Sequence, residues 1–154
     1  MGDSVRNVTF YKRGAQTGNG IFREFGWKEN TGVQAKLYPI DSIVSHYRVG
    51  PFNFMKIDVQ GAEVLALNGA QKTLSTVEVI TTEASIMNYN IGGATFFQLI
   101  STFEKYGFAL FDVIDMMRKG PGHGFAVQVD LVFVRKTSKL WSKRCTGFEP
   151  VAAN

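Results

Sequence analysis

The alternation of hydrophobic and polar positions predicts the elements of the N-terminal part of the chain. Residues 7–12 (NVTFYK) alternate weakly, and residues 33–38 (VQAKLY) alternate clearly, as half-buried strands do. Between them, RGAQTGNG has the glycine and asparagine content of a loop. After Pro39, the apolar residues of IDSIVSHY (40–47) have the spacing of one helical face. The pattern therefore predicts two strands followed by a helix.

A second pattern begins at residue 52, where an apolar run leads into a turn and a helix. Residues 52–59 (FNFMKIDV) are apolar on both faces apart from Lys56, which is typical of a central strand in a sheet covered by helices. Gly61 predicts the turn. Residues 62–70 predict a helix, with Asn68-Gly69 as its stop signal.

The remaining elements complete an α/β order. Residues 77–82 predict a strand, and residues 95–106 predict a helix that stops at Gly107. Residues 108–114 and 127–135 predict two final strands, joined by the loop DMMRKGPGHGFA. Strands that alternate with helices form parallel sheets, and a closing strand pair adds an antiparallel strand. We therefore expect an α/β fold: a mostly parallel sheet with an antiparallel strand at one side, near the C-terminus.

Length and composition indicate one domain, spanning residues 1–154. The chain has 154 residues, of which 45% are hydrophobic and 19% charged, as in globular domains. No apolar run has the length needed to cross a bilayer, so we predict no membrane partner. Cys145 is the only cysteine, which excludes an intrachain disulfide and a cysteine zinc site and favours a cytoplasmic location.

The net charge is +4, and part of this excess lies in the basic C-terminal tail, residues 137–154. A basic tail can bind phosphates or a membrane surface, but a solvated chain end is the commoner explanation. The basic residues have no interleaved aromatic side chains and form no recognition motif. The sequence therefore predicts no nucleic-acid partner.

Two acidic residues are candidates for chemistry because each ends a predicted strand. Ligands bind beyond the carboxyl ends of strands in open α/β sheets, where Asp58 and Glu83 are expected to lie. On neighbouring strands their carboxylates could act as a general base, position a substrate or share a cation. Alternatively, Asp58 caps the following helix and Glu83 is solvated or paired with a lysine. Gly61 and Glu63 have the pattern of a turn and a first-turn acid of a helix.

The two histidines are weaker candidates. His123, in GPGHG, lies on a loop that would overhang the same rim and could act as an acid or base, although a lone loop histidine is a weak signal. His46 lies among helix-like residues and is expected at the surface or in the core. The sequence has no Gly-x-Ser-x-Gly, Walker or His-Glu-x-x-His motif, which disfavours serine hydrolysis, P-loop chemistry and zinc proteolysis.

The region 52–74 contains a longer pattern, MKIDVQGAEVLALNGAQKTL. It resembles the signature of the FkbM family of S-adenosylmethionine-dependent methyltransferases, in which a strand ends in Lys-Ile-Asp-Val-Glu-Gly-Ala-Glu. Gln60 stands where that signature has its first glutamate. Flanking segments follow the family's order, so the resemblance covers roughly residues 33–136, and the N-terminal region more weakly.

The resemblance implies transfer of a methyl group from S-adenosylmethionine to an oxygen of a sugar or similar small-molecule acceptor. Asp58 and Glu83, with His123, are the candidate catalytic residues. Lys56, Gln60 and Glu63 of the signature are the candidate acceptor-binding residues. Two carboxylates alone are weak evidence for a metal, so no metal site is predicted.

One departure from the family bears on the cofactor. The family holds S-adenosylmethionine with a glycine-rich turn after its first strand, and TGNGIF has no such strand before it. The cofactor-binding residues are therefore not identified, and the chain resembles the second half of a Rossmann-like fold, as a truncated methyltransferase would.

In the family, the first strand lies beside the signature strand, so its absence leaves residues 54–59 as an apolar sheet edge. We expect residues 7–12 or 33–38, or another chain, to cover this edge, or the chain to be a fragment. A non-catalytic binding or oligomerisation module is the alternative function.

Overall fold

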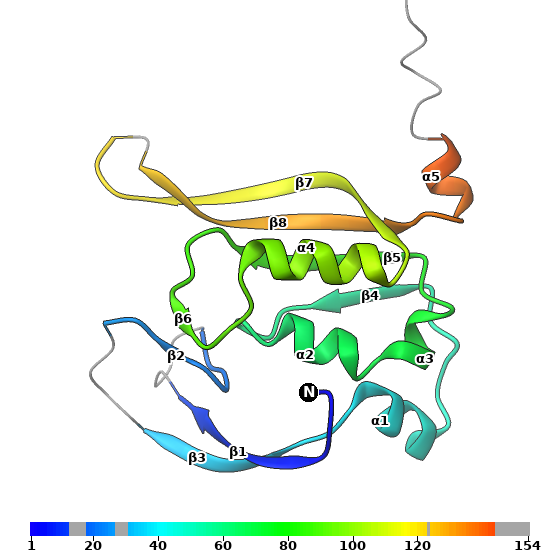
Figure 1. Ribbon diagram of the computed structural model, residues 1–154, viewed down its shortest axis with the longest axis horizontal. Coiled ribbons are helices and arrows are strands. Elements are labelled where there is room, and N and C mark those ends of the chain that lie inside the picture. The colour runs from blue at the N-terminus through cyan, green and yellow to red at the C-terminus, as the bar shows by residue number, and fades with distance from the viewer. Residues whose placement is uncertain (13–17, 27–30, 123, 144–154) are drawn as a thin grey trace, which may run out of the picture.

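The computed structural model describes residues 1–12, 18–26, 31–122 and 124–143. Its elements are arranged as a sheet with helices on one face and a smaller N-terminal lobe below it (Figure 1). In chain order they are β1 (Arg6–Tyr11), β2 (Arg23–Glu24), β3 (Gly32–Leu37), α1 (Ile40–Tyr47), β4 (Phe54–Ile57), α2 (Glu63–Asn68), α3 (Gln71–Leu74), β5 (Val79–Ser85), β6 (Asn90–Ile91), α4 (Phe96–Lys105), β7 (Phe108–Lys119), β8 (Phe125–Arg135) and α5 (Lys139–Lys143).

The main sheet has four strands in the order β4-β5-β8-β7. β4 and β5 are parallel, whereas β8 is antiparallel to both β5 and β7. The expectation of a mostly parallel sheet is therefore wrong for two of its three pairings. β7 and β8 form a hairpin, and β8 also pairs with β5 on its other side. The strand that runs antiparallel to its neighbours is therefore β8, which lies inside the sheet and not at its side.

The hairpin also extends further than the sequence predicts. β7 continues to Lys119 and β8 begins at Phe125, although residues 115–126 are predicted as a loop. Three register shifts interrupt the β7–β8 ladder, between Leu110 and Asp112, between Val113 and Asp115, and after Met117. Such bulges break the period of two that identifies a strand, so this extension has no clear sequence signal.

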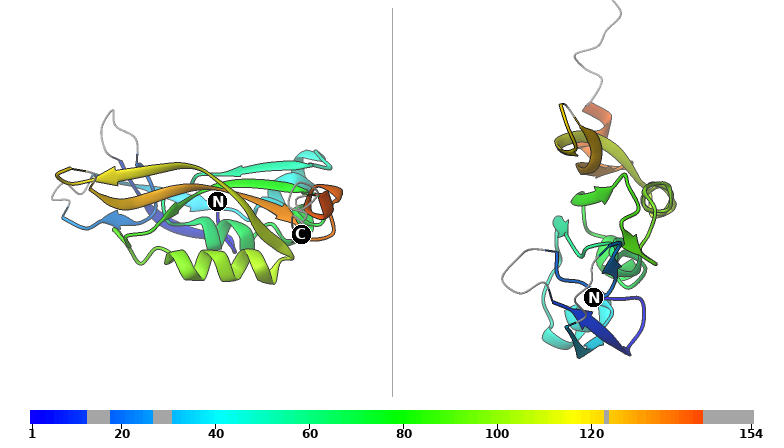
Figure 2. Two further views of the ribbon diagram at one scale, coloured as in Figure 1. Left: turned by 90° about the horizontal axis from the view of Figure 1, so that it is seen from above. Right: turned by 90° about the vertical axis from the view of Figure 1, so that its left-hand side faces the viewer.

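Helices α2, α3 and α4 cover one face of the sheet (Figure 2). Along β5, Ile80, Thr82 and Ala84 are buried and alternate with half-buried residues, so only one face of this strand is fully covered. Phe103 of α4 is completely buried and its ring stacks on Phe133 of β8, with ring centroids 3.8 Å apart. The core therefore lies between the sheet and this single layer of helices.

The two predicted helices over this face are confirmed. α2 ends at Asn68 and Gly69 caps it, as the Asn-Gly stop signal predicts. α4 begins with a capping box in which the Thr95 hydroxyl accepts from the backbone N–H of Gln98 and the Gln98 side chain accepts from that of Thr95. Local sequence signals therefore set the bounds of both helices.

The N-terminal lobe consists of α1 and a two-stranded antiparallel sheet of β1 and β3. Asp41 of α1 connects the lobe to α3, because the Asp41 carboxylate accepts the backbone N–H groups of Lys72 and Thr73, each at 2.8 Å. These bonds satisfy free N–H groups at the start of α3. β1 and β3 pair with each other, so neither covers β4. β4 is an edge strand of the described sheet, and its prediction as a central strand is wrong.

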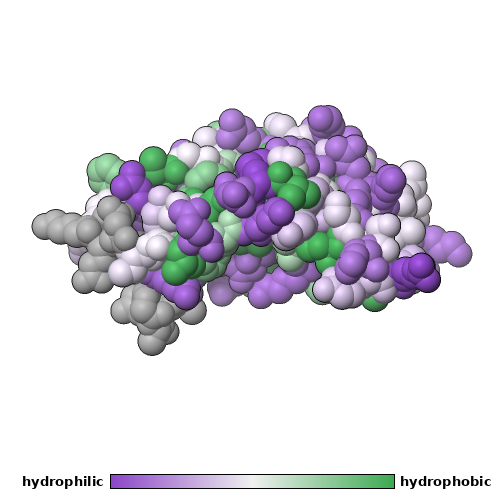
Figure 3. Space-filling view, turned by 90° about the horizontal axis from the view of Figure 1, so that it is seen from below, coloured by the Kyte–Doolittle hydropathy of each residue, from purple (hydrophilic) through white to green (hydrophobic). Residues whose placement is uncertain are grey.

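On the underside of the molecule, where the N-terminal lobe lies, apolar side chains are scattered among polar ones and do not gather in one patch (Figure 3). In the described part of the chain, no helix is both long and apolar enough to cross a membrane. Part of the predicted basic tail forms the short helix α5, and residues 144–154 lie outside the described residues.

Replacing Phe103 with alanine tests the packing of this one-layered core. The substitution removes a completely buried ring, and we expect the free energy of unfolding in urea to fall by about 3–5 kcal/mol. Phe97→Ala on the same helix is the matched control, because Phe97 is 79% exposed. Its effect should stay within about 0.5 kcal/mol. Equal losses in the two variants would contradict this description of the core.

Candidate functional site

The parallel register of β4 and β5 brings the two predicted acids to the same rim. Ile57 pairs with Thr82, so the next residues, Asp58 and Glu83, follow side by side. The Gln60 side-chain amide donates to Asp58 Oδ1 at 3.1 Å and to Glu83 Oε1 at 3.2 Å. The two carboxylates and the amide therefore form one connected cluster.

A tight turn after β4 positions Gln60. Ala62 N–H donates to the carbonyl of Val59 at 3.3 Å, and the two residues between them have positive φ, 52° at Gln60 and 92° at Gly61. Two positive φ angles are characteristic of a type I′ turn. Gly61 has a second requirement, because a Cβ there would lie 3.0 Å from Asn90 Cβ. The predicted glycine turn is therefore confirmed.

Glu63 has a structural position at the start of α2. It is buried, and its Oε1 accepts the backbone N–H of Gly61 at 3.0 Å. Burial raises the pKa of the Glu63 carboxyl. The N-cap residue of α2 is Ala62, with no side-chain cap, so Asp58 does not cap this helix. Glu63 does not line the polar hollow described next.

Asp58, Gln60 and Glu83 line a polar hollow of about 510 Å³ at the rim. Further polar side chains line it from β2, β7, β8 and the segment before β6. The lining residues include Glu24, Tyr89, Lys119 and Gln128. Sequence reasoning missed these residues. Glu24 lies in β2, which has two residues and therefore no periodicity. Lys119 and Gln128 reach the rim because β8 pairs with both β5 and β7, a choice that no local pattern encodes.

The glycines of TGNG also reach this hollow. Gly18 and Asn19 line it, and a Cβ added to Gly20 would lie 3.3 Å from Gln60 Cβ. The sequence analysis interpreted this segment as a loop and not as a glycine-rich cofactor turn, which gave no reason to place it here. Its glycines allow the N-terminal segment to approach the turn at Gln60 closely.

The surroundings of Glu83 raise the pKa of its carboxyl group. Burial and then the charge of Asp58 raise the pKa of Glu83 from 4.5 to about 7. The hydrogen bond from Gln60 acts in the opposite direction, whereas the charge of Asp130, directly opposite Glu83 on β8, raises the pKa further. A carboxyl that ionises near neutral pH is suited to act as a general base.

Tyr89 adds a hydroxyl group to the wall of the hollow. Its Oη donates to Gln128 Oε1 at 3.0 Å. Burial raises the pKa of the Tyr89 hydroxyl above its usual value, so it stays protonated at neutral pH. The wall therefore combines a hydroxyl and amides with acids, all of which can form hydrogen bonds with hydroxyl groups.

Two of the remaining candidates, Lys56 and His46, lie outside the polar hollow. Lys56 is exposed on β4, with Nζ 3.6 Å from Asp58 Oδ2, and it lines a different cavity. His46 is on the exposed side of α1, in edge contact with the ring of Tyr47. His123 lies outside the described residues.

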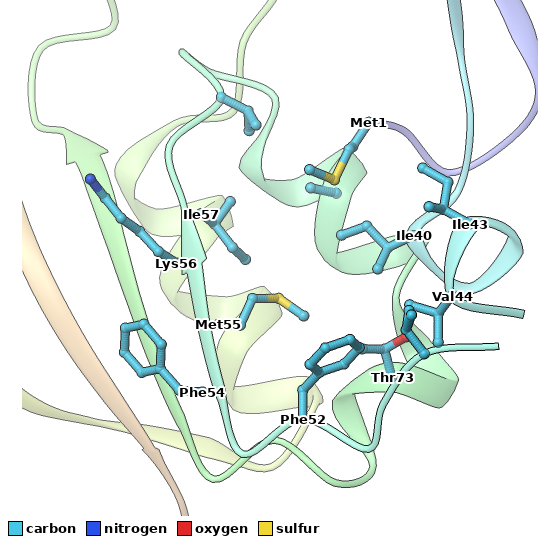
Figure 4. Close-up of a pocket in the computed structure, with 13 residues that line it drawn as sticks. Met1, Ile40, Ile43, Val44, Phe52, Phe54, Met55, Lys56, Ile57 and Thr73 are labelled. Atoms are coloured by element: carbon cyan, nitrogen blue, oxygen red, sulfur yellow. The ribbon is translucent and has the colours of Figure 1, made fainter. Parts of the chain in front are cut away.

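A second, apolar cavity of about 310 Å³ lies beside β4. Figure 4 shows Met55 and Ile57 of β4 pointing toward Met1 and Ile40, whereas Phe54 and Lys56 point the other way. α1 and its flanking segments close the far side, with Ile43, Val44, Val49 and Phe52 in the lining. The cavity therefore separates β4 from the N-terminal lobe.

The backbone of β4 is unpaired along this side. The carbonyl of Asn53 accepts the N–H of Val79, so the backbone of Asn53 faces β5. In a parallel ladder, only every second residue of a strand forms hydrogen bonds with a given neighbouring strand. The N–H and C=O groups of Phe54 and Lys56 therefore point away from β5. No other strand of the described chain pairs with β4. The apolar free edge expected from the sequence is thus present.

Comparison with protein families gives one match. The model of the methyltransferase FkbM domain matches residues 1–110. The matched region contains the N-terminal lobe, the signature and Glu83, and it ends within β7. No curated protein and no solved structure matches the chain.

The described residues offer no preformed centre for a metal or for S-adenosylmethionine. They contain no group of three or more His, Cys, Asp or Glu side chains placed to hold a metal ion. The cofactor's glycine-rich turn would lead from a strand into a helix, but Gly18 and Gly20 lead into strand β2. The described residues therefore do not form that cradle.

The raised pKa of Glu83 predicts how stability depends on pH. The folded state holds the carboxyl proton of Glu83 more tightly than the unfolded state does. The contribution of the protonated Glu83 to the free energy of unfolding is therefore full below about pH 4.5 and is lost as the pH rises through about 7. Glu83→Gln removes this loss. We expect it to stabilise the protein relative to wild type by about 1–2 kcal/mol at pH 8, after allowance for solvent screening.

Urea unfolding at pH 5 and pH 8 checks this difference. The comparison with wild type separates Glu83 from the direct effect of burial on the pKa of Glu63, because Glu63 is present in both proteins. If the two proteins lose the same stability between these pH values, Glu83 is not the group that titrates.

Proposed function

Because the chain belongs to the family of FkbM methyltransferase domains, we propose that its polar hollow binds the methyl acceptor and that Glu83 is the general base. The supporting observation is the cluster itself. Glu83 ionises near neutral pH, beside Asp58, at the carboxyl ends of two parallel strands.

In the proposed reaction, an acceptor hydroxyl donates a hydrogen bond to the ionised carboxylate of Glu83. With S-adenosylmethionine bound beside the hollow, the acceptor oxygen would gain the methyl group as the bond from that carbon to the sulfonium sulfur breaks and S-adenosylhomocysteine leaves, and the hydroxyl proton would pass to Glu83. Asp58 fixes the orientation of the acceptor by accepting a second hydrogen bond. Methyltransferases of this family take the methyl group from S-adenosylmethionine, which the described residues alone do not cradle.

A sugar or similar small polyol fits the proposed acceptor. The hollow presents two carboxylates, the Tyr89 hydroxyl and the amide of Gln128, all of which form hydrogen bonds with hydroxyl groups. The single cysteine favours a reducing compartment, so we place the reaction in the cytoplasm.

Asp58→Asn tests the proposed site. Its amide retains the shape of the carboxylate but loses the charge, and we expect methyl transfer to fall by about 10²–10⁴-fold with an unchanged far-ultraviolet circular dichroism spectrum. The assay measures transfer from S-adenosyl-[methyl-³H]methionine to a panel of monosaccharides by the full chain. Asp112→Asn, which changes an exposed acid on β7, is the matched control and should keep its activity. Full activity of the Asp58 variant would remove Asp58 from the site.

A second candidate function rests on the free edge of β4. The unpaired backbone of Phe54 and Lys56 borders an apolar cavity that α1 closes on its far side. This space suits a single extended strand, which would pair with β4 and bury its side chains in the cavity. We propose an extended segment of a second copy as the occupant, which makes the chain a self-associating module.

Phe54→Pro tests this association. The N–H of Phe54 points away from β5, so proline removes the hydrogen bond to an added strand, together with the phenyl ring, and leaves the β4–β5 ladder intact. Light scattering across a concentration series should show dimers of the wild type and monomers of this variant. Met55→Pro is the contrasting variant, because it breaks the β4–β5 ladder and should unfold the protein. A wild type that is monomeric at every concentration would exclude the second function.

A further inference from the structure

We propose that Gln60 is a positioning residue whose side-chain amide holds Asp58 and Glu83 at a fixed separation and keeps Glu83 able to ionise. The hydrogen-bond geometry around the turn supports this role directly. Its importance for catalysis rests on the proposed function, whereas its effect on the two acids does not.

The amide is chemically matched to its two neighbours. A side-chain NH₂ group has two N–H donors, and ionised carboxylates only accept. Gln60 Nε2 lies 3.1 Å from Asp58 Oδ1 and 3.2 Å from Glu83 Oε1, so each donor has one acid as its partner. A neutral group thereby joins two acids on different strands, which would otherwise repel each other.

The backbone at this position gives an independent argument. Gln60 has a φ of 52°, a conformation that glycine and asparagine adopt more readily than glutamine. If the turn alone determined the residue at this position, a glycine or an asparagine would suit it better than a glutamine. Glutamine has the length to span from the turn to Glu83 on the neighbouring strand, so the bridge explains a side chain that the backbone does not favour.

The charges around Glu83 show why the bridge matters. Most groups around it are acids or uncharged hydrogen-bonding groups: Asp58 after β4, Asp130 of β8, Glu63 of α2, and Glu24, Tyr89 and Gln128 in the lining. Lys119 of β7 is the cation in the lining of the hollow. Asp58, Asp130 and Glu63 all favour the protonated form of Glu83. The hydrogen bond from Gln60 favours the ionised form and lowers the pKa of Glu83.

Loss of the bridge should therefore make Glu83 harder to ionise. In Gln60→Ala the bond disappears, and in Gln60→Glu a third carboxylate replaces the donor. We expect the titration midpoint of Glu83 to rise by roughly half a pH unit or more in the alanine variant, and further in the glutamate variant. The midpoint is measured by ¹³C NMR of the full chain labelled at glutamate side-chain carboxyls, with Glu83→Gln to assign the signal.

Gln60→Asn separates the bridge from the turn. Asparagine suits a positive φ better than glutamine, but it is one methylene shorter and cannot reach both acids. We expect this variant to keep or gain resistance to urea while its Glu83 midpoint rises as in Gln60→Ala. A Glu83 midpoint that stays at the wild-type value in both variants would overturn the proposal.

The same measurements are independent of methyl transfer. A raised Glu83 midpoint in a chain that transfers no methyl group supports the bridge and counts against the proposed function only. An unchanged midpoint in an active chain counts against the bridge only.

Discussion

The parallel pairing of β4 with β5 is the constraint on which the candidate site depends. Its register places Ile57 opposite Thr82. The next residue after each of these two, Asp58 and Glu83, therefore lies at the same rim. The turn after β4 then returns Gln60 between them. A shift of one residue in this pairing would turn one of the two carboxylates to the other face of the sheet. The acid-base chemistry of the site is therefore a consequence of strand register.

The sheet is covered by helices on one face only, and this determines where chemistry and association can occur. Helices α2 to α4 bury the apolar side chains of the core on one face, so polar side chains such as Glu83 and Asp130 lie on the other. At the edge, β4 has an unpaired backbone beside an apolar cavity. The polar hollow supports a role in methyl transfer and the free edge supports association with another strand. Because they lie on different sides of β4, the two functions are compatible.

The sequence predicted the parts of the structure that depend on local signals. The stop at Asn68-Gly69 and the turn at Gly61 follow from short patterns within the signature. The meeting of Asp58 and Glu83 was expected from the rule that parallel neighbouring strands end at one rim. The insertion of β8 between β5 and β7 depends on which strand edges pair over long distances, and no local pattern encodes that choice. Glu24 reaches the hollow from β2, a strand too short to have a period, and Tyr89 reaches it from the segment before β6. The bridging role of Gln60 required side-chain distances, although its departure from the signature was visible in the sequence.

The central claim is that Asp58 and Glu83 form one coupled pair at this rim, and the ionisation of Glu83 in the presence and absence of the Asp58 charge tests it most directly. Carboxyl ¹³C NMR of the wild type should give a pKa of about 7 for Glu83. In Asp58→Asn the pKa should fall toward the ordinary value of glutamate, because the neighbouring charge is removed while burial remains. A wild-type Glu83 that titrates at about 4.5, unchanged by the Asp58 substitution, would contradict the account.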